Sequence, residues 1–259
     1  MIPRAYIQQW AACTPWPDLH QVEQDLIVCR AICDLFNHPP LQGKLAFRGG
    51  TAINKLLFSK PLRYSEDIDL VQTQPEPVGR IIDAVRDSLS WLGKCNCIHS
   101  PHTTHLVFKF NPEASESTLK LKIEINTREH QSFLGLKVFP FEIASDWHKA
   151  KADVVSFEPE ELLGTKLRAL LQRQKIRDLF DLNEGLLQLE LDCDKLMTCF
   201  HHYLTHEGHL ISRSNAEERM LKKLNHSLTA DIAPLLPAGV IFDDDAAIDR
   251  KSTRLNSSH

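Results

Sequence analysis

Two short segments decide the fold: Phe47-Arg-Gly-Gly50 and Tyr64-Ser-Glu-Asp67-Ile-Asp69-Leu70. The first predicts a short strand that ends at paired glycines, and the alternation of polar and apolar residues over 67–71 predicts a second strand. Residues i and i+2 of a strand point to the same face, so Asp67 and Asp69 should present two carboxylates side by side. Ile68 and Leu70 should face the buried side.

A third carboxylate is expected from the strand predicted over 118–126. Its leucines and isoleucines form an apolar face, and Glu124 is the only acid on the polar face. Adjacent carboxylates repel one another unless a cation lies between them, and hard divalent ions prefer such oxygen ligands. Asp67, Asp69 and Glu124 therefore predict a metal site of the kind that phosphoryl and nucleotidyl transfer require.

The glycines Gly49 and Gly50 precede a helix predicted over 51–58, with Thr51 near its N-cap. Backbone N–H groups at such a turn can hold the oxygens of a triphosphate. Each feature is weak by itself, because Asp-x-Asp pairs are commonly solvated charges and Gly-Gly turns are widespread. Their combination, with an acid on a later strand, resembles the signature of polymerase-β-type nucleotidyltransferases.

The remaining pattern divides the chain near residues 150–160. Helices are expected over 19–37 and 78–92 and a strand over 104–110, whereas helices alone are expected from Glu160 to residue 236. We therefore expect a mixed α/β domain over 1–155 and a helical domain over 156–248. The segment 249–259 is similar to a translated sequencing-library adapter, and we expect it to be an artefact without a place in the fold.

Composition limits the classes of protein that fit. The 259 residues carry 30 Lys and Arg against 34 Asp and Glu, a net charge of −4 that excludes a generic polybasic nucleic-acid coat. No apolar run is long enough to cross a bilayer, and the first ten residues lack the apolar core of a signal peptide. Seven scattered cysteines indicate reduced thiols, so we expect a cytoplasmic protein with no membrane partner.

Longer segments resemble the AbiEii/AbiGii toxin family. They are 47–52, 63–70, 122–129, 161–170 and 177–182. The resemblance implies an α+β fold: a polymerase-β-like nucleotidyltransferase domain with a mixed sheet, followed by a helical C-terminal domain. It also implies a nucleotidyltransferase toxin of a type IV toxin–antitoxin or phage-defence (abortive infection) system, whose relatives add nucleotides to tRNA acceptor ends.

The resemblance assigns roles to individual residues. Asp67 and Asp69 would bind metal, with Glu124 as the third acid and activator of the attacking hydroxyl. Phosphate contacts would come from Gly49, Gly50, Ser65, Lys166 and Arg177. Asp178 or Asp181 would complete the site from the helical domain, and the sequence leaves open which of the two is essential.

The basic residues around Lys166 have a second interpretation. Lys166, Arg173 and Arg177 fall at i, i+7 and i+11, so on one continuous helix they would share a face that is either merely solvated or binds phosphate. Two clusters of soft ligands are discounted as metal sites. They are the Cys and His residues of 95–105 and the histidines His201, His202, His206 and His209. The spacing of the first fits no closed four-ligand arrangement, and the second is more simply explained by surface histidines or satisfied core histidines.

Together these features predict an enzyme that uses Mg²⁺, or Mn²⁺ in its place, to transfer a nucleotide from an NTP to an RNA acceptor, with tRNA favoured. A cognate antitoxin is expected to act without direct contact. Two alternatives remain open at this stage. The acceptor could be a hydroxyl of a protein or small molecule, or the chain could be a non-catalytic NTP- or RNA-binding module.

Overall fold

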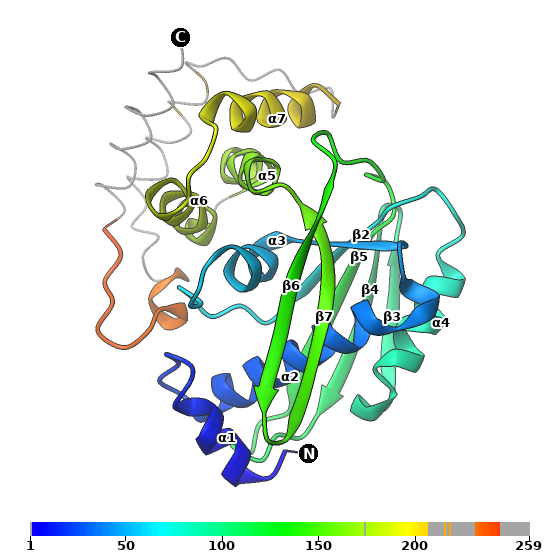
Figure 1. Cartoon of the computed structure of the whole chain (residues 1–259), viewed down its shortest axis with the longest axis vertical. Helices are drawn as coiled ribbons and strands as arrows, with labels where there is room; N and C mark the ends of the chain where they lie inside the picture. The colour runs from blue at the N-terminus through cyan, green and yellow to red at the C-terminus, as the bar shows by residue number, and fades with distance from the viewer. Residues whose placement is uncertain (1, 174, 207–214, 216–217, 219–230, 244–259) are drawn as a thin grey trace. The chain divides into compact units, whose positions relative to one another are not determined.

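The computed structural model describes residues 2–173, 175–206, 215, 218 and 231–243, so the segment 249–259 lies outside the described residues. The chain forms two compact units (Figure 1). Unit 1 contains Met1–Gln131 and Gly135–Phe157, and unit 2 contains Ser132–Leu134 and Glu158–His259. None of the described helices is long and apolar enough to span a membrane.

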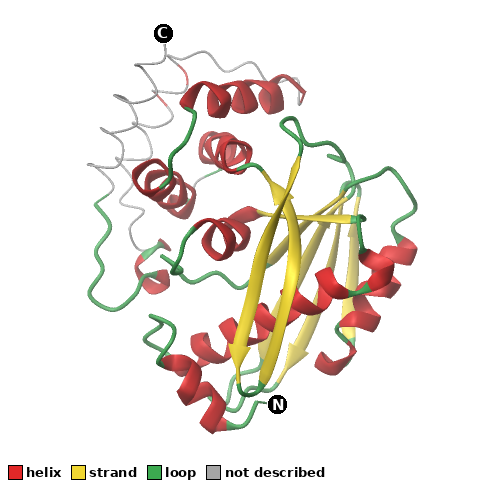
Figure 2. Cartoon of the chain, in the orientation of Figure 1, coloured by secondary structure: helices red, strands yellow, loops and turns green. Residues whose placement is uncertain are grey.

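Unit 1 is built on a mixed sheet, which Figure 2 shows in yellow. In the described part of the chain this sheet has seven strands, in the order β3-β4-β5-β2-β1-β7-β6. The pairs β2–β5 and β1–β7 are parallel, and the other neighbouring pairs are antiparallel. The strands are β1 (Leu45–Arg48), β2 (Ile68–Gln72), β3 (Cys95–Ser100), β4 (Thr103–Phe110), β5 (Leu119–Asn126), β6 (Leu136–Ser145) and β7 (His148–Phe157).

Helix α2 (Leu19–Asn37) forms the centre of the unit 1 core. It contacts β5, β6 and β7, which lie at different places in the strand order of the sheet. The alternating apolar residues of β5, Leu121, Ile123 and Ile125, are fully buried, and their polar neighbours lie on the opposite face. The other helical segments of this unit are α1 (Arg4–Ala11), the 3₁₀ turns Pro39–Leu41 and Ser90–Leu92, α3 (Gly49–Ala52), the π-helical turn Ile53–Leu57 and α4 (Gly79–Ser88).

The predicted α+β class with a mixed sheet is confirmed, and the helix predicted over 19–37 has the predicted bounds. The predicted N-cap at Thr51 is wrong. The helix begins at Gly49, with Arg48 in the N-cap position, because the hydroxyl of Thr51 bonds to the loop before β2 rather than to its own helix. The β6–β7 hairpin and α1 were not predicted.

The regular secondary structure in the described part of unit 2 is helical, as predicted for the segment after Glu160. They are α5 (Pro159–Gln172), α6 (Ile176–Gln188), α7 (Cys193–His206) and the 3₁₀ turn Ala233–Leu235. Helix α5 packs against both α6 and α7. Their apolar faces supply the core of this unit, with Leu163, Leu170, Leu182 and Leu196 among its most buried residues.

Glu161 attaches the segment 132–134 to the helices of unit 2. Its buried carboxylate accepts hydrogen bonds from the backbone N–H groups of Phe133 and Leu134, at 2.7 and 2.9 Å. It also accepts the hydroxyls of Ser132 at 2.7 Å and Tyr203 at 2.5 Å. A buried charge is tolerated when several donors satisfy it, so these four bonds explain an acid in the middle of a core.

We predict that Glu161→Ala destabilises unit 2 by about 3 kcal/mol, because it leaves buried donors without an acceptor. Urea unfolding would measure the loss, and hydrogen exchange should show faster exchange at the Phe133 and Leu134 amides. Glu160→Ala is the matched control, because among the described residues Glu160 accepts a single exposed hydrogen bond, 3.2 Å from the Asp192 amide. Equal destabilisation by both variants would contradict this role of Glu161.

Candidate active site

One row of residues crosses five strands of unit 1. The registers of the sheet place Arg48 opposite Asp69, Asp69 opposite Glu124, Glu124 opposite His105, and His105 opposite Ile98. The carboxylates of Asp69 and Glu124, far apart in sequence, are therefore neighbours on adjacent parallel strands. Asp67 immediately precedes β2, so the three acids predicted from the sequence lie together at one part of the sheet.

Gly49 provides the space that Asp69 occupies. It follows β1 with φ +81°, a backbone conformation that favours glycine. A Cβ atom at this position would lie 2.1 Å from Oδ2 of Asp69 and 2.9 Å from its Cγ. Because glycine has no side chain, Gly49 both permits the turn from β1 into α3 and leaves room for the carboxylate of Asp69.

The loop before β2 is held by the helix that follows Gly49. The Thr51 hydroxyl lies 2.8 Å from the hydroxyl of Ser65, and it donates a hydrogen bond to the backbone oxygen of Asp67. Asn54 accepts the backbone N–H groups of Leu62 and Arg63 and donates to the oxygen of Gly50 at 3.0 Å. These bonds fix Ser65 and Asp67 relative to the glycine turn.

Two basic side chains lie beside Glu124 on its own face of the sheet. Nζ of Lys122 lies 2.9 Å from Oε2 of Glu124. Nδ1 of His105 lies 3.4 Å from the same oxygen, but it forms a hydrogen bond with no atom of the described residues. Burial would lower the pKa of Lys122, but the hydrogen bond to Glu124 and the charges of Glu124, Asp67 and Asp69 outweigh it and raise the pKa. All three carboxylates thus contribute to the raised pKa of Lys122.

The carboxylates have the donor chemistry that a hard divalent cation requires. Over the described ranges, however, no three His, Cys, Asp or Glu side chains converge as a ready-made metal site. The physical reason in unit 1 is that the carboxylate of Glu124 is directed to Lys122 and His105. The three acids have the oxygen ligands that a divalent metal needs and lie on or next to adjacent strands. To bind a metal, Glu124 would have to leave Lys122 and His105.

The predicted residues of unit 2 form a separate charge network. Nζ of Lys166, on α5, lies 3.0 Å from Oδ1 of Asp178 and 3.1 Å from Oδ2 of Asp181, both on α6. All three side chains are buried. Arg173 adds two hydrogen bonds to Asp178, at 2.7 and 2.8 Å. Both aspartates therefore pair with Lys166 in the same way.

The shared basic face predicted for Lys166, Arg173 and Arg177 is wrong. Helix α5 ends at Gln172, Arg173 is extended, and α6 begins only at Ile176, so the three residues do not belong to one helix. The break allows Arg173 to turn back onto Asp178. Arg177 lies in the first turn of α6 and is half-buried.

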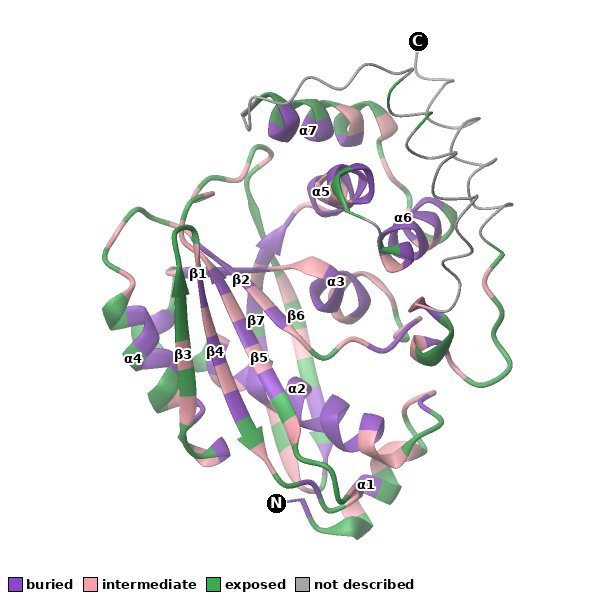
Figure 3. Cartoon of the chain, turned by 180° about the vertical axis from the view of Figure 1, so that it is seen from behind, coloured by how far each residue is buried: buried purple, intermediate pink, exposed green. Residues whose placement is uncertain are grey.

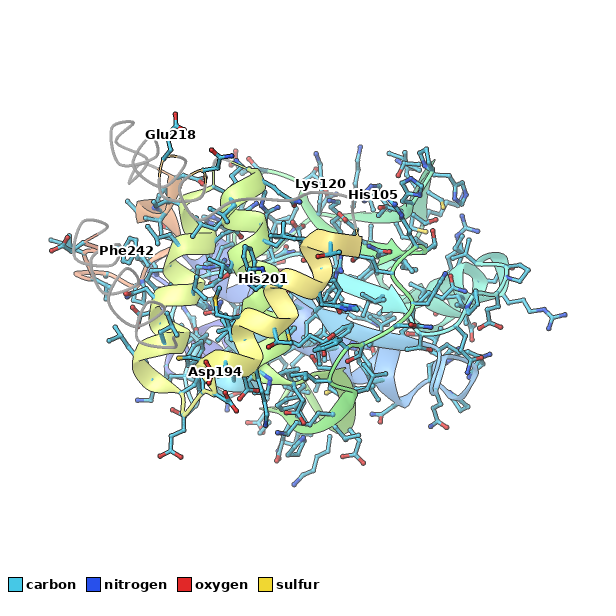
Figure 4. The ribbon with its side chains drawn as sticks, turned by 90° about the horizontal axis from the view of Figure 1, so that it is seen from above. His105, Lys120, Asp194, His201, Glu218 and Phe242 are labelled. Atoms are coloured by element: carbon cyan, nitrogen blue, oxygen red, sulfur yellow. The ribbon has the colours of Figure 1, made fainter. Side chains whose placement is uncertain are left out.

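The discounted soft ligands lie in ordinary elements. Cys95, Cys97 and His99 belong to β3, and His105 belongs to β4 of the same hairpin. His202 stacks on Phe133, and His201 lies on α7, where Figure 4 labels it. His209 and the side chain of His206 lie outside the described residues.

The structure adds site residues that sequence reasoning did not assign. Lys122 and His105 contact Glu124, and Arg48 is held 2.7 Å from Oε2 of Glu129 beside Asp69. Lys122 was visible as an i−2 neighbour of Glu124 on a predicted strand. His105 gave no such signal, because only the β4–β5 register brings it to Glu124.

The fold is that of nucleotidyltransferases. MenT4, a nucleotidyltransferase toxin from Mycobacterium tuberculosis H37Rv, superimposes with a TM-score of 0.70 at 14% identity, over 100% of this chain and 91% of that one. Two Helicobacter pylori proteins also match: a candidate nucleotidyltransferase (TM-score 0.59, 14% identity, 93% and 98% covered) and JHP933 (0.56, 16%, 91% and 95%). A search of curated proteins finds no matching relative.

A sequence model of the family described as nucleotidyl transferase AbiEii toxin, type IV TA system, matches residues 30–253. The chain belongs to this family. It is therefore an enzyme, a nucleotidyltransferase toxin of a type IV toxin–antitoxin system.

We predict that Gly49→Ala abolishes nucleotide transfer, because the new methyl group displaces the carboxylate of Asp69. Gly43→Ala is the matched control: Gly43 also has a positive φ, +70°, but an added Cβ there would meet no atom within 4 Å. Both variants should lose about 1 kcal/mol of stability from backbone strain in thermal unfolding. Only Gly49→Ala should lose activity, and an active Gly49→Ala enzyme would contradict this role of the glycine.

We predict an acid-sensitive contribution of Asp178 to stability. Burial would raise the pKa of this carboxyl, but the hydrogen bonds from Arg173 and the charge of Lys166 outweigh burial and lower the pKa to about 2. Because the folded-state pKa is below the unfolded value of about 4, the ionised group contributes about 2 kcal/mol above pH 4. That contribution disappears as the pH falls from 4 to 2.

Urea unfolding of wild type and Asp178→Asn at pH 6 and pH 3 would test this. The free energy of unfolding should be about 3 kcal/mol lower for Asp178→Asn than for wild type at pH 6, and this difference should become smaller at pH 3. Asp194→Asn is the control, because Asp194 is an exposed residue of α7, labelled in Figure 4. A difference that does not change with pH would rule out the ion pairing as its source.

Proposed function

We propose that this toxin transfers a nucleotide from an NTP to the 3′-hydroxyl of an RNA, with tRNA as its acceptor. The observation that carries the proposal is the pairing of Asp69 with Glu124, beside Asp67 and the glycine turn at 49–50. Nucleotidyl transfer needs carboxylates next to a site for phosphates, and in this proposal the three acids and the glycine turn of unit 1 would fill these two roles.

The reaction forms a bond between the 3′-oxygen of the acceptor and the α-phosphorus of the NTP. The bond from the α-phosphorus to the oxygen bridging it to the β-phosphate breaks, and pyrophosphate leaves with the electron pair of that bond. The proton of the 3′-hydroxyl passes to the carboxylate of Glu124. In this proposal Lys122 and His105 hold Glu124 before substrates bind.

Asp67, Asp69 and Glu124 would hold Mg²⁺, or Mn²⁺ in its place, which when bound neutralises phosphate charge and lowers the pKa of the attacking hydroxyl. Phosphate oxygens would bind to the N–H groups of Gly49 and Gly50 and to the Ser65 hydroxyl, which Thr51 holds in place. The roles proposed for Lys166 and Arg177 are also phosphate contacts. Asp178 and Asp181 would act as positioning residues for Lys166.

The biological setting is proposed from family membership. A type IV system pairs its toxin with an antitoxin that, in our proposal, acts without binding the toxin. The cytoplasm, where NTPs and tRNA are abundant, is the proposed location, and defence against phage is the proposed purpose.

We predict that wild type incorporates labelled nucleotide into total tRNA and that Asp69→Asn lowers the rate by on the order of 10²-fold or more, because it removes charge from the site of phosphoryl transfer. Asp83→Asn, an exposed residue of α4, should retain full activity. Growth arrest on expression should likewise be lost in Asp67→Ala.

Periodate oxidation of the tRNA destroys its 3′-terminal diol and identifies the acceptor group. Labelling should disappear with oxidised tRNA. Labelling that persists on oxidised RNA, or that appears on protein or small molecules instead, would refute the proposed acceptor. NTP binding without transfer to any acceptor would favour a binding module.

A further inference from the structure

The inference concerns the face of β3, β4 and β5 that carries Glu124, here named the outer face. The registers of these strands assign its residues to successive cross-strand rows. The outer face comprises Asn96, Ile98 and Ser100 of β3, Thr103, His105, Val107 and Lys109 of β4, and Lys120, Lys122, Glu124 and Asn126 of β5. Its three lysines and one histidine accompany a single acid, so the face is basic although the chain as a whole is acidic.

The lysines Lys109, Lys120 and Lys122 form a ladder that leads to Glu124. Lys109 lies directly opposite Lys120, and Lys122 is the next residue of β5 on the same face. Like charges that face each other across strands destabilise a sheet. Lys109 and Lys120 are exposed, and neither forms an ion pair with any residue in the described ranges. An anionic ligand on this face would relieve the repulsion between the two lysines.

The outer face is directed away from the core of unit 1. The neighbouring residues Leu106, Phe108, Leu121 and Ile123 point to the opposite side and are fully buried. Figure 3 looks onto the outer face, with α2 behind the strands. Figure 4 labels His105 and Lys120, from β4 and β5.

The order of strands separates the ladder from the glycine turn. Gly49 follows β1, the acids lie on or beside β2 and β5, and the lysines lie on β5 and β4, so the acids lie between the turn and the ladder. Lys120 is four residues from Glu124, roughly 14 Å along an extended strand. A triphosphate at the glycine turn therefore lies on the other side of the acids. In-line transfer requires the attacking oxygen and the leaving oxygen to lie on opposite sides of the phosphorus.

We infer that the outer face binds the phosphodiester backbone of the acceptor strand, with Lys109 and Lys120 on its phosphates and the terminal hydroxyl near Glu124. This inference rests on the proposed function. It identifies the acceptor as a polynucleotide that extends several phosphates back from its 3′ end, because Lys109 and Lys120 are too far from Glu124 for a terminal nucleotide alone.

The test is the double charge reversal Lys109→Glu with Lys120→Glu, which leaves Lys122 and all carboxylates intact. We expect the KM for tRNA to rise about tenfold or more, with the KM for NTP and the kcat at saturating tRNA unchanged. The slope of log affinity against log salt should decrease in magnitude by about 1.4 to 1.8, because two phosphate contacts are lost. A trinucleotide acceptor should show a smaller difference between the two proteins.

Lys149→Glu with Lys151→Glu is the matched control, since both are exposed lysines of β7 in the same sheet and the change in net charge is equal. Thermal unfolding of both variants checks that the sheet is intact. An unchanged KM for tRNA, or a raised KM for NTP instead, would overturn the inference while leaving the transferase function in place.

If wild type labels no RNA, the proposed function fails, and RNA binding measured by fluorescence anisotropy still decides the inference. Weaker binding and a smaller salt slope in the Lys109 and Lys120 double variant, but not in the β7 control, would support the outer face as an RNA-binding surface. Equal binding by all three proteins would overturn it.

Discussion

Parallel pairing of β2 with β5 is the constraint on which the candidate site depends. It brings Asp69 beside Glu124 and simultaneously places Ile68 beside Ile123 in the core. A slip of one residue would bury the carboxylates and expose the isoleucines, so core burial enforces the register that the proposed chemistry needs. Core packing and the candidate site therefore depend on the same register at these two strands. The glycine turn after β1 belongs to the same arrangement, because Asp69 occupies the space that a side chain at Gly49 would fill.

Unit 2 depends on a different interaction, the buried ion pairs of Lys166. An unpaired ammonium in a helical core would be costly, and two aspartates one turn apart on α6 compensate it. The break between α5 and α6 brings Arg173 to the same cluster. A basic residue that looked like part of a solvated face is thus internal to the unit, and its charge is already balanced by its partners.

The sequence predicted strands correctly where apolar residues lie on one buried face. It failed where apolar residues are also exposed, so that no regular alternation is visible. Strand β5, which carries Glu124, alternates cleanly because one of its faces packs on α2. Strand β6 was missed because it contains Pro140 and exposes Leu136 and Val138, features that argue against an interior strand. Both are tolerated because β6 lies at the edge of the sheet, a fact of topology rather than of local pattern.

The sequence by itself determined the α+β class, the helix at 19–37 and the three acids with their glycine turn, because residue periodicity and type carry that information locally. Only the tertiary structure decided which residues surround those acids. His105 reaches Glu124, and Lys109 faces Lys120, through the β4–β5 register, and the helix break sends Arg173 to Asp178. Strand register and helix termination result from packing between distant segments, so no local pattern could specify these neighbours.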